Sequence, residues 1–152
     1  MVKFTRLALA VLTGLLVTPA FAQDAPVLKI YTYDGFASEW GPGPGLKAGF
    51  EATCGCTVEW VAADSSIGTL RRVQLEGATT EADLIVGLDT AIAGEARATG
   101  LFADHGLDLS QLVLPEPWTD QQFVPFDYSH FAFVYDTDTV KTPPKSFEEL
   151  IA

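Results

Sequence analysis

The sequence predicts an α/β fold in which a mainly parallel sheet is flanked by helices. Three apolar segments have the length and composition of strands: residues 27–31, 57–62 and 82–87. A segment of helical pattern follows each of them: residues 46–52, 67–77 and 90–99. Strands that alternate with helices in this way form parallel sheets covered on both faces. A further strand is expected at residues 131–135, after a proline-interrupted irregular stretch.

Each predicted strand has its own pattern. Residues 27–31 are a short apolar run, and Val58, Trp60 and Ala62 alternate with other side chains in the second strand. Residues 82–87 show little alternation, which is expected of a strand buried on both faces.

The predicted helices are delimited by glycine and proline. The helix at residues 46–52 follows Gly-Pro-Gly-Pro-Gly and is expected to turn Phe50 inward. In the helix at residues 67–77, Leu70, Val73 and Leu75 are expected near one face, and the final glycine is a C-terminal cap. Gly100 closes the third helix in the same way.

The first 22 residues have the pattern of a secretory signal peptide. Lys3 and Arg6 precede an apolar run at residues 7–17, and Ala20-Phe21-Ala22 is a small-residue cleavage signal. The alternative, a membrane anchor, needs about 20 apolar residues, and this run is shorter. The pattern predicts export of residues 23–152 to the periplasm.

The last residues predict a helix that continues beyond the printed sequence. Pro143-Pro144 is a stop, and Ser146 with Glu149 has the spacing of a capping box that opens a helix. Fewer than two turns follow before Ala152, and so short a helix does not offset its nucleation cost. We therefore expect a longer protein, truncated here in a helix.

The charge of the chain disfavours polyanionic partners. It has 9 basic and 20 acidic residues, with a formal net charge of −11. A surface of this sign repels nucleic acid and anionic membranes. It is compatible with a cationic ligand.

Two cysteines, Cys54 and Cys56, are separated by one glycine. In an oxidising compartment they can pair, because the glycine permits the tight turn that such a bridge requires. The alternative is a metal site, which would need further ligands. The two histidines, His105 and His130, do not have metal-ligand spacing, so no metal site is expected.

The segment from Tyr31 to Gly45 combines aromatic and acidic side chains in a region rich in glycine and proline. Tyr33 and Trp40 are candidates for stacking on a flat, cationic ligand, with each contact worth roughly 0.5–2 kcal/mol. The alternative is that both rings pack against the domain itself. Asp34 and Glu39 in this segment can be turn-capping or solvated acids.

Other candidates follow the second and third predicted strands, where ligands bind in open α/β sheets. Asp64, Ser65 and Ser66 can cap a helix or hold a phosphate or hydroxyl. Asp89 likewise has a capping and a binding interpretation. Asp127 and Tyr128 form a second aromatic and acidic cluster. No nucleophile elbow is present to make Ser65 or Ser66 a hydrolase nucleophile, so an enzyme is not expected.

Several long motifs, in order, resemble the periplasmic thiamine-binding proteins of bacterial thiamine ABC transporters. They are Tyr31-Thr32-Tyr33-Asp34-x-Phe36-Ala37-x-x-Trp40-Gly41-Pro42-Gly43-Pro44, Phe50-Glu51-Ala52-x-Cys54-x-Cys56, Gly87-Leu88-Asp89, Thr99-Gly100-Leu101-Phe102-Ala103, and the run from Phe123 to Asp136. The resemblance implies a fold like the type II periplasmic binding proteins, with residues 23–152 as the amino-terminal lobe and the second lobe absent.

The resemblance also implies a function. The protein would bind thiamine or its phosphates without a cofactor and deliver it to a thiamine ABC permease in the inner membrane. The first-lobe half of the cleft would be lined by Tyr33, Trp40, Asp64, Ser65, Ser66, Asp89, Asp127 and Tyr128. The alternatives are a binding protein for another solute, such as a polyamine or ferric iron, and a truncated, non-functional fragment.

Overall fold

The computed structural model describes residues 25–151. The predicted signal peptide, residues 1–22, lies outside the described residues. The chain divides into two compact units, with the boundary between Ile92 and Ala93. The first unit contains the sheet, and each unit is described by itself below.

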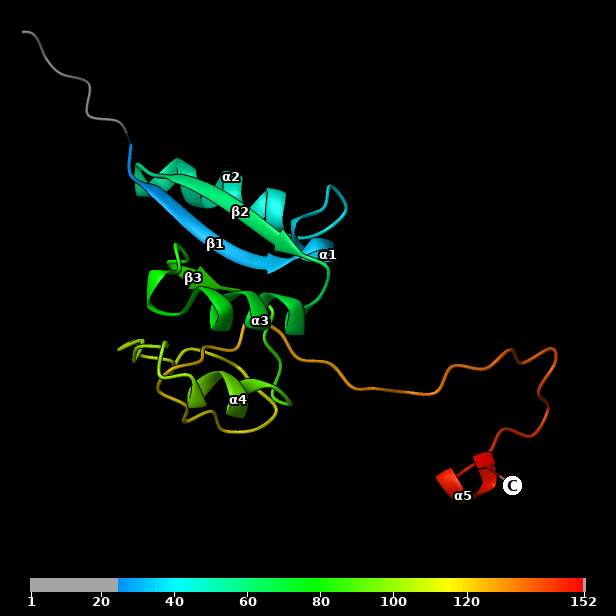
Figure 1. Cartoon of the computed structure of the whole chain (residues 1–152). Helices are drawn as coiled ribbons and strands as arrows, with labels where there is room; N and C mark the ends of the chain where they lie inside the picture. Colours follow the sequence, from blue (N-terminus) through cyan, green and yellow to red (C-terminus); the bar gives the residue numbers. More distant parts are fainter. Residues whose placement is uncertain (1–24, 152) are drawn as a thin grey trace, which may run out of the picture. The chain divides into compact units, whose positions relative to one another are not determined.

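The first unit is built on a three-stranded sheet with the order β2-β1-β3 (Figure 1). The strands are β1 (Val27–Tyr33), β2 (Thr57–Ala63) and β3 (Leu84–Ile85). Both pairings are parallel, and the β1–β2 register runs from Val27 beside Thr57 to Tyr33 beside Ala63. The prediction of an α/β fold with a parallel sheet is confirmed.

Helices cover both sides of the β1–β2 pair. Figure 1 shows α2 (Gly43–Cys54) on one side of these strands and α3 (Ser66–Glu76) on the other. A short helix, α1 (Asp34–Ala37), follows β1 directly, and the 3₁₀ helix η1 (Gly77–Thr79) follows α3. Pro44 stands in the first turn of α2, where its missing N–H leaves no hydrogen bond unmade.

The core of the first unit lies where these layers meet. Its buried apolar side chains come from two strands and two helices: Ile30, Tyr31, Phe36, Val58, Leu70 and Val73. Thr69 is also buried, and its hydroxyl lies 2.9 Å from the Thr32 carbonyl oxygen, to which it donates. This bond fixes the first turn of α3 to the end of β1.

An ion pair secures the end of α3. The Arg72 guanidinium donates to Glu76 Oε1 at 2.8 Å and lies 4.5 Å from the centre of the Tyr31 ring. The hydrogen bond from Arg72 is the main cause that lowers the pKa of Glu76, and the Thr80 hydroxyl adds to it. Because both side chains of the ion pair are partly exposed, solvent screens it.

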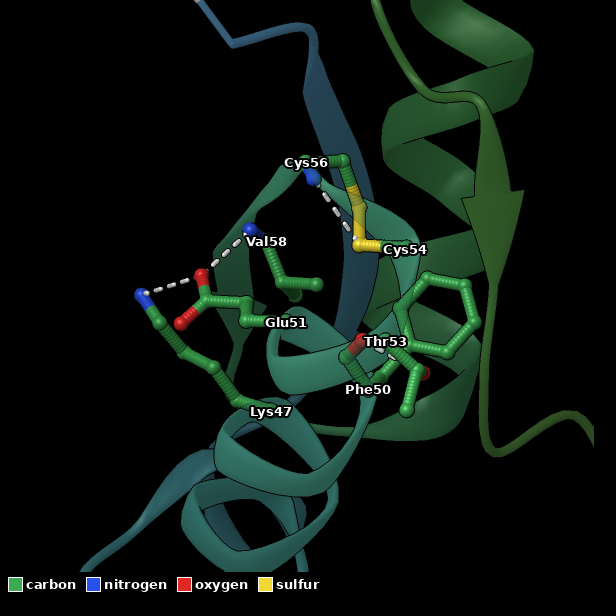
Figure 2. The surroundings of a disulfide bond; sticks show 7 residues. All are labelled: Lys47, Phe50, Glu51, Thr53, Cys54, Cys56 and Val58. Atoms are coloured by element: carbon green, nitrogen blue, oxygen red, sulfur yellow. Dashed lines mark hydrogen bonds and ion pairs between the residues drawn. A yellow bond between two sulfur atoms is a disulfide. The ribbon is translucent and has the colours of Figure 1, made fainter.

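Two contacts join α2 to β2, as Figure 2 shows. Cys54 and Cys56 form a disulfide across Gly55, whose φ of 63° is left-handed. Beside it, the Val58 backbone N–H donates to Glu51 Oε1 at 2.7 Å. A disulfide and a hydrogen bond therefore both stabilise the junction between α2 and β2.

The second unit has little regular structure. It contains α4 (Ala93–Ala98) and α5 (Phe147–Ile151), joined by irregular chain. Half of the predicted capping box at α5 is present: the Glu149 N–H donates to Ser146 Oγ at 3.2 Å. The Glu149 carboxylate accepts from the N–H of Lys145, one residue before the cap, at 2.7 Å. Within residues 25–151, no helix has the length and apolarity needed to cross a membrane.

Several predicted elements are shorter than expected or absent. β3 has two residues rather than six, and α4 begins at Ala93 rather than at residue 90. The strand predicted at residues 131–135 is wrong: the segment has no regular structure, and its aromatic side chains are exposed. An apolar run becomes a strand only beside a neighbour that pairs with its backbone, and none pairs with it among the described residues.

Two side chains predicted to face the core do not. Leu75 is 90% exposed. A helix turns by 100° per residue, so Leu75 lies well away from the side occupied by the buried Leu70 and Val73. Phe50 is 49% exposed, because the neighbouring residue of α2, Glu51, is the one that reaches β2.

Candidate functional site

The carboxyl ends of the three strands meet at one edge of the sheet. β1 ends at Tyr33 beside Ala63 of β2, and the Val86 N–H donates to the Tyr31 carbonyl at 2.9 Å. The segments that follow the strands therefore begin at a common edge, as the sequence predicts. In open α/β sheets this edge is where ligands bind.

The aromatic segment after β1 folds back sharply on itself. The Ser38 N–H donates to the Asp34 carbonyl at 2.9 Å, and the Gly41 N–H donates to the Ser38 carbonyl at 3.0 Å. Gly41 lies so close to α1 that a Cβ there would stand 2.2 Å from the Gly35 carbonyl oxygen. A side chain at position 41 would break this turn, which carries Trp40.

Trp40 is 83% exposed. Its ring tip, Cη2, lies 3.3 Å from the point where a Cβ on Gly35 would stand, and Tyr33 Cε2 lies at the same distance from that point. Both candidate aromatic rings therefore border one small residue. Most of the indole surface is in solvent and free to stack on a flat ligand.

Tyr33 is half-buried and held more firmly. Its ring meets Phe36 edge-to-face, with ring centres 6.0 Å apart. Phe36 is buried and meets Trp60 of β2 in the same manner at 5.4 Å. The Tyr33 ring, a candidate for ligand stacking, therefore packs on a series of aromatic rings that extends into the core.

Asp64, Ser65 and Ser66 follow β2 at the same edge. Ser65 is the N-cap of α3, and its Oγ accepts from the Gly68 N–H at 3.1 Å. It also donates to Asp64 Oδ1 at 3.1 Å. The capping interpretation therefore holds for Ser65, while the Asp64 carboxylate stays exposed at the edge.

Asp89 follows β3 and is also exposed. Its Oδ1 accepts from the N–H groups of Ala91 and Ile92, at 2.9 and 3.2 Å. This carboxylate organises the start of the next segment. With Asp34, Glu39 and Asp64 it gives the first unit several exposed acids in the segments that follow its strands. Such acids suit a ligand that is positively charged.

Asp127 and Tyr128 lie in the second unit. Both are exposed, and the Tyr128 ring meets His130 edge-to-face at 6.4 Å. Their place in the site stays a prediction that rests on the resemblance.

The second unit also has a polar recess that the sequence interpretation missed. Arg97, Trp118 and Asp120 line it, among other residues. Asp120 forms an ion pair with Arg97 and accepts from the N–H groups of Gln122 and Phe123. Burial raises the Asp120 pKa, but these hydrogen bonds and the arginine outweigh it, and the pKa is lowered.

The Asp120 carboxylate in this recess thus already has an ion-pair partner and two hydrogen-bond donors within its own unit. One of its partners, Arg97, is 23 residues away in sequence, and no local motif predicts that pairing. Among residues 25–151, no group of three His, Cys, Asp or Glu side chains could hold a metal ion.

A parallel α/β unit with aromatic and acidic side chains at the carboxyl edge of its sheet has the features of a ligand-binding α/β lobe. The comparisons with known proteins identify the particular relatives. The chain is 48% identical, over 130 residues, to a thiamine-binding periplasmic protein of Brucella suis biovar 1 (strain 1330). It is 46% identical, over 133 residues, to a thiamine-binding periplasmic protein of Escherichia coli (strain K12).

A solved structure agrees with these relatives. The chain matches a periplasmic thiamin binding protein with a TM-score of 0.77 and 46% identity, over 84% of this chain. No protein-family profile matches the chain. The predicted resemblance to thiamine-binding periplasmic proteins and the type II binding-protein fold are confirmed. The names of the relatives also agree with a periplasmic binding protein rather than an enzyme.

The matches cover most of this chain and a smaller part of each relative. They span 86% and 88% of the chain, but 39% and 40% of the two relatives. The chain therefore spans about two fifths of the length of the curated relatives that it matches.

Proposed function

We propose that this chain forms one wall of a thiamine site in the periplasmic binding component of an ABC importer. The single observation that supports it best is the edge of the β2-β1-β3 sheet, where Tyr33 and Trp40 border the same glycine and exposed carboxylates follow β1, β2 and β3. The names of the relatives supply the ligand.

The chemistry of thiamine suits this edge. Its thiazolium ring is cationic and its aminopyrimidine is flat, so it can stack on Tyr33 and on the exposed Trp40. Asp64 or Asp89 can balance the positive charge or accept hydrogens from the amino group. Asp127 and Tyr128 complete the proposed contacts of this half of the site.

The Ser65 and Ser66 hydroxyls lie at the start of α3 and are the proposed contacts for the hydroxyethyl end of thiamine or for the phosphates of its esters. The N–H groups at a helix N-terminus favour such groups. The loaded protein would deliver its ligand to a membrane permease driven by a separate ATPase subunit.

Trp40→Ala in the full-length mature protein tests this proposal. The substitution removes an exposed stacking surface, so thiamine affinity should fall by roughly 1–3 kcal/mol. The matched control is Phe50→Ala, which removes a half-exposed aromatic ring from α2 of the same unit. Calorimetric titration with thiamine measures both. Equal affinity of Trp40→Ala and the wild type would remove Trp40 from the site.

Competition separates thiamine from the other solutes. Thiamine monophosphate should displace labelled thiamine if the phosphate contacts at Ser65 and Ser66 exist. Displacement by spermidine at comparable concentration would instead indicate a polyamine site. A visible absorbance band after incubation with ferric iron would indicate tyrosine ligation of that ion.

A further inference from the structure

The Tyr33 ring is confined on three sides within the first unit. Phe36 meets it edge-to-face, and Gly35 borders its Cε2 edge. On the opposite edge lies Gly87, in the segment after β3: a Cβ on Gly87 would stand 2.4 Å from Tyr33 Cε1 and 2.5 Å from Cδ1. Gly87, which is 54 residues away in sequence, therefore packs directly against the Tyr33 ring.

No side chain fits between Gly87 and the ring. Real Cβ atoms essentially never come within 3.0 Å of another heavy atom of this kind, so a methyl group at position 87 must displace something. The β1 backbone is held on both sides by strand pairing, with β2 through Tyr33 and with β3 through Tyr31. The added methyl group would therefore push against the Tyr33 side chain rather than the β1 backbone, and the ring would have to turn away.

We infer that Gly87 is a positioning residue of the ligand site. Because position 87 has no side chain, the Cδ1–Cε1 edge of the Tyr33 ring packs against the backbone after β3. This contact sets the orientation of the ring face on which a flat, cationic ligand ring stacks. The inference rests on the proposed function of this sheet edge. It adds a residue that itself presents no functional group to the ligand.

Gly35 has a related place on the other side of the ring. A Cβ there would lie 3.3 Å from both Tyr33 Cε2 and Trp40 Cη2. That approach is tight but meets only the ends of two side chains, which can shift by a few tenths of an ångström. Gly35→Ala is therefore a milder variant that leaves the backbone in place and crowds the same rings.

A double-mutant cycle between positions 87 and 33 tests the inference. Gly87→Ala should weaken thiamine binding by about two- to thirty-fold, the range set by loss of one aromatic contact to a cation. In a Tyr33→Ala background, the added Gly87→Ala should cause no further loss, because the ring that it displaces is gone. Gly35→Ala should cause a smaller loss, which also depends on the Tyr33 ring.

Two glycine substitutions serve as controls. Gly87 has a φ of 102°, so alanine there adds backbone strain as well as the clash. Gly77→Ala adds strain from a positive φ without the clash, since its φ is 56° and nothing lies within 4 Å of its Cβ position. Gly49→Ala, within α2, adds a methyl group without either effect. Both controls should bind thiamine like the wild type.

A readout without ligand makes the result decisive. In the full-length mature protein with ring-labelled tyrosine, the NMR signal that Tyr33→Ala removes is that of Tyr33. Gly87→Ala should shift that signal, and Gly77→Ala should not. An unmoved Tyr33 signal, or an equal loss of affinity with and without the ring, would overturn the inference. If the signal moves but the wild type does not bind thiamine, the ring packing stands and the proposed function is wrong.

Discussion

The two units of the chain are held together in different ways. In residues 25–92, apolar side chains from strands and helices are buried around a parallel sheet. In residues 93–151, Ala96 is the one apolar side chain that is buried among those described, and order comes from hydrogen bonds around Asp120 and His105. The comparison teaches that the first unit is organised by burial and the second by polar contacts.

His105 in the second unit shows how specific those polar contacts are. His105 Nδ1 accepts from the Leu107 N–H at 2.9 Å, so the ring proton is on Nε2, which lies 3.1 Å from the Asp120 carbonyl oxygen and donates to it. Both ring nitrogens are thus engaged. The indole of Trp118 donates to the Phe123 carbonyl at 2.8 Å in the same region.

The largest expected effect comes from the core of the first unit. Leu70→Ala should lower the free energy of unfolding by about 2–5 kcal/mol, because the side chain is fully buried and leaves a cavity. Leu75→Ala, one turn further along α3 and 90% exposed, should change it by less than about 0.5 kcal/mol. Chemical denaturation measures both. Similar losses for the two variants would remove the burial-based account of this unit.

The next largest effect is expected when the Asp120 carboxylate of the second unit is removed. Asp120→Ala leaves the Gln122 and Phe123 N–H groups and Arg97 without their acceptor. The local opening free energy should fall by about 1–3 kcal/mol. Hydrogen exchange should show faster exchange at Gln122 and Phe123, and unchanged exchange in β1.

The control for this variant is Asp104→Ala, which removes an exposed carboxylate from the same recess. Its amide exchange should match the wild type. If both substitutions speed amide exchange equally, the negative charge of the recess, rather than the hydrogen bonds of Asp120, stabilises the second unit.

The disulfide between Cys54 and Cys56 should contribute only a small part of the free energy of unfolding. A bridge across a loop of three residues restricts the unfolded chain by about 1.6 kcal/mol in the loop-entropy account. The paired variant Cys54→Ser, Cys56→Ser should lose roughly that amount, because Glu51 still holds the Val58 N–H. Thermal unfolding measures it. A loss above about 4 kcal/mol would make the disulfide the main support of this junction.

The smallest effect depends on pH. The lowered pKa of Glu76 means that its carboxylate form is favoured by folding, mainly through Arg72. This contribution is complete above the unfolded pKa of about 4.3 and is lost as the pH falls through the folded value below it. Glu76→Gln should therefore be less stable than the wild type at neutral pH, and the difference should fade in acid. A difference independent of pH would contradict the ion pair as its source.

The sequence predicts the first unit better than the second, and the reason is physical. The pattern around Val58 and Leu70 records burial, so β2 and α3 could be predicted to within a residue or two. The apolar run at residues 131–135 has the same composition as a strand, but pairing depends on a neighbour that composition does not reveal. The ion pair between Asp120 and Arg97 joins residues that are 23 positions apart, and it leaves no local pattern in the sequence.

The candidate site could be predicted in part for the same reason. Tyr33 and Trp40 belong to one short segment, and the parallel sheet places Asp64 and Asp89 after neighbouring strands. The contact between Tyr33 and Gly87 joins two segments through side-chain packing. This contact depends on the pairing of β1 with β3, which brings the two segments together. Neither segment predicts it alone.

The central claim is that the carboxyl edge of the β2-β1-β3 sheet is a wall of the ligand site. The most direct measurement is an NMR titration of the ¹⁵N-labelled, full-length mature protein with thiamine, in which each tryptophan of this chain gives an indole N–H signal. The account predicts that the Trp40 indole and the amides of Tyr33 and Gly87 shift, while the Trp60 and Trp118 indoles change little. Thiamine binding that shifts Trp118 and leaves Trp40 and Tyr33 unmoved would contradict it.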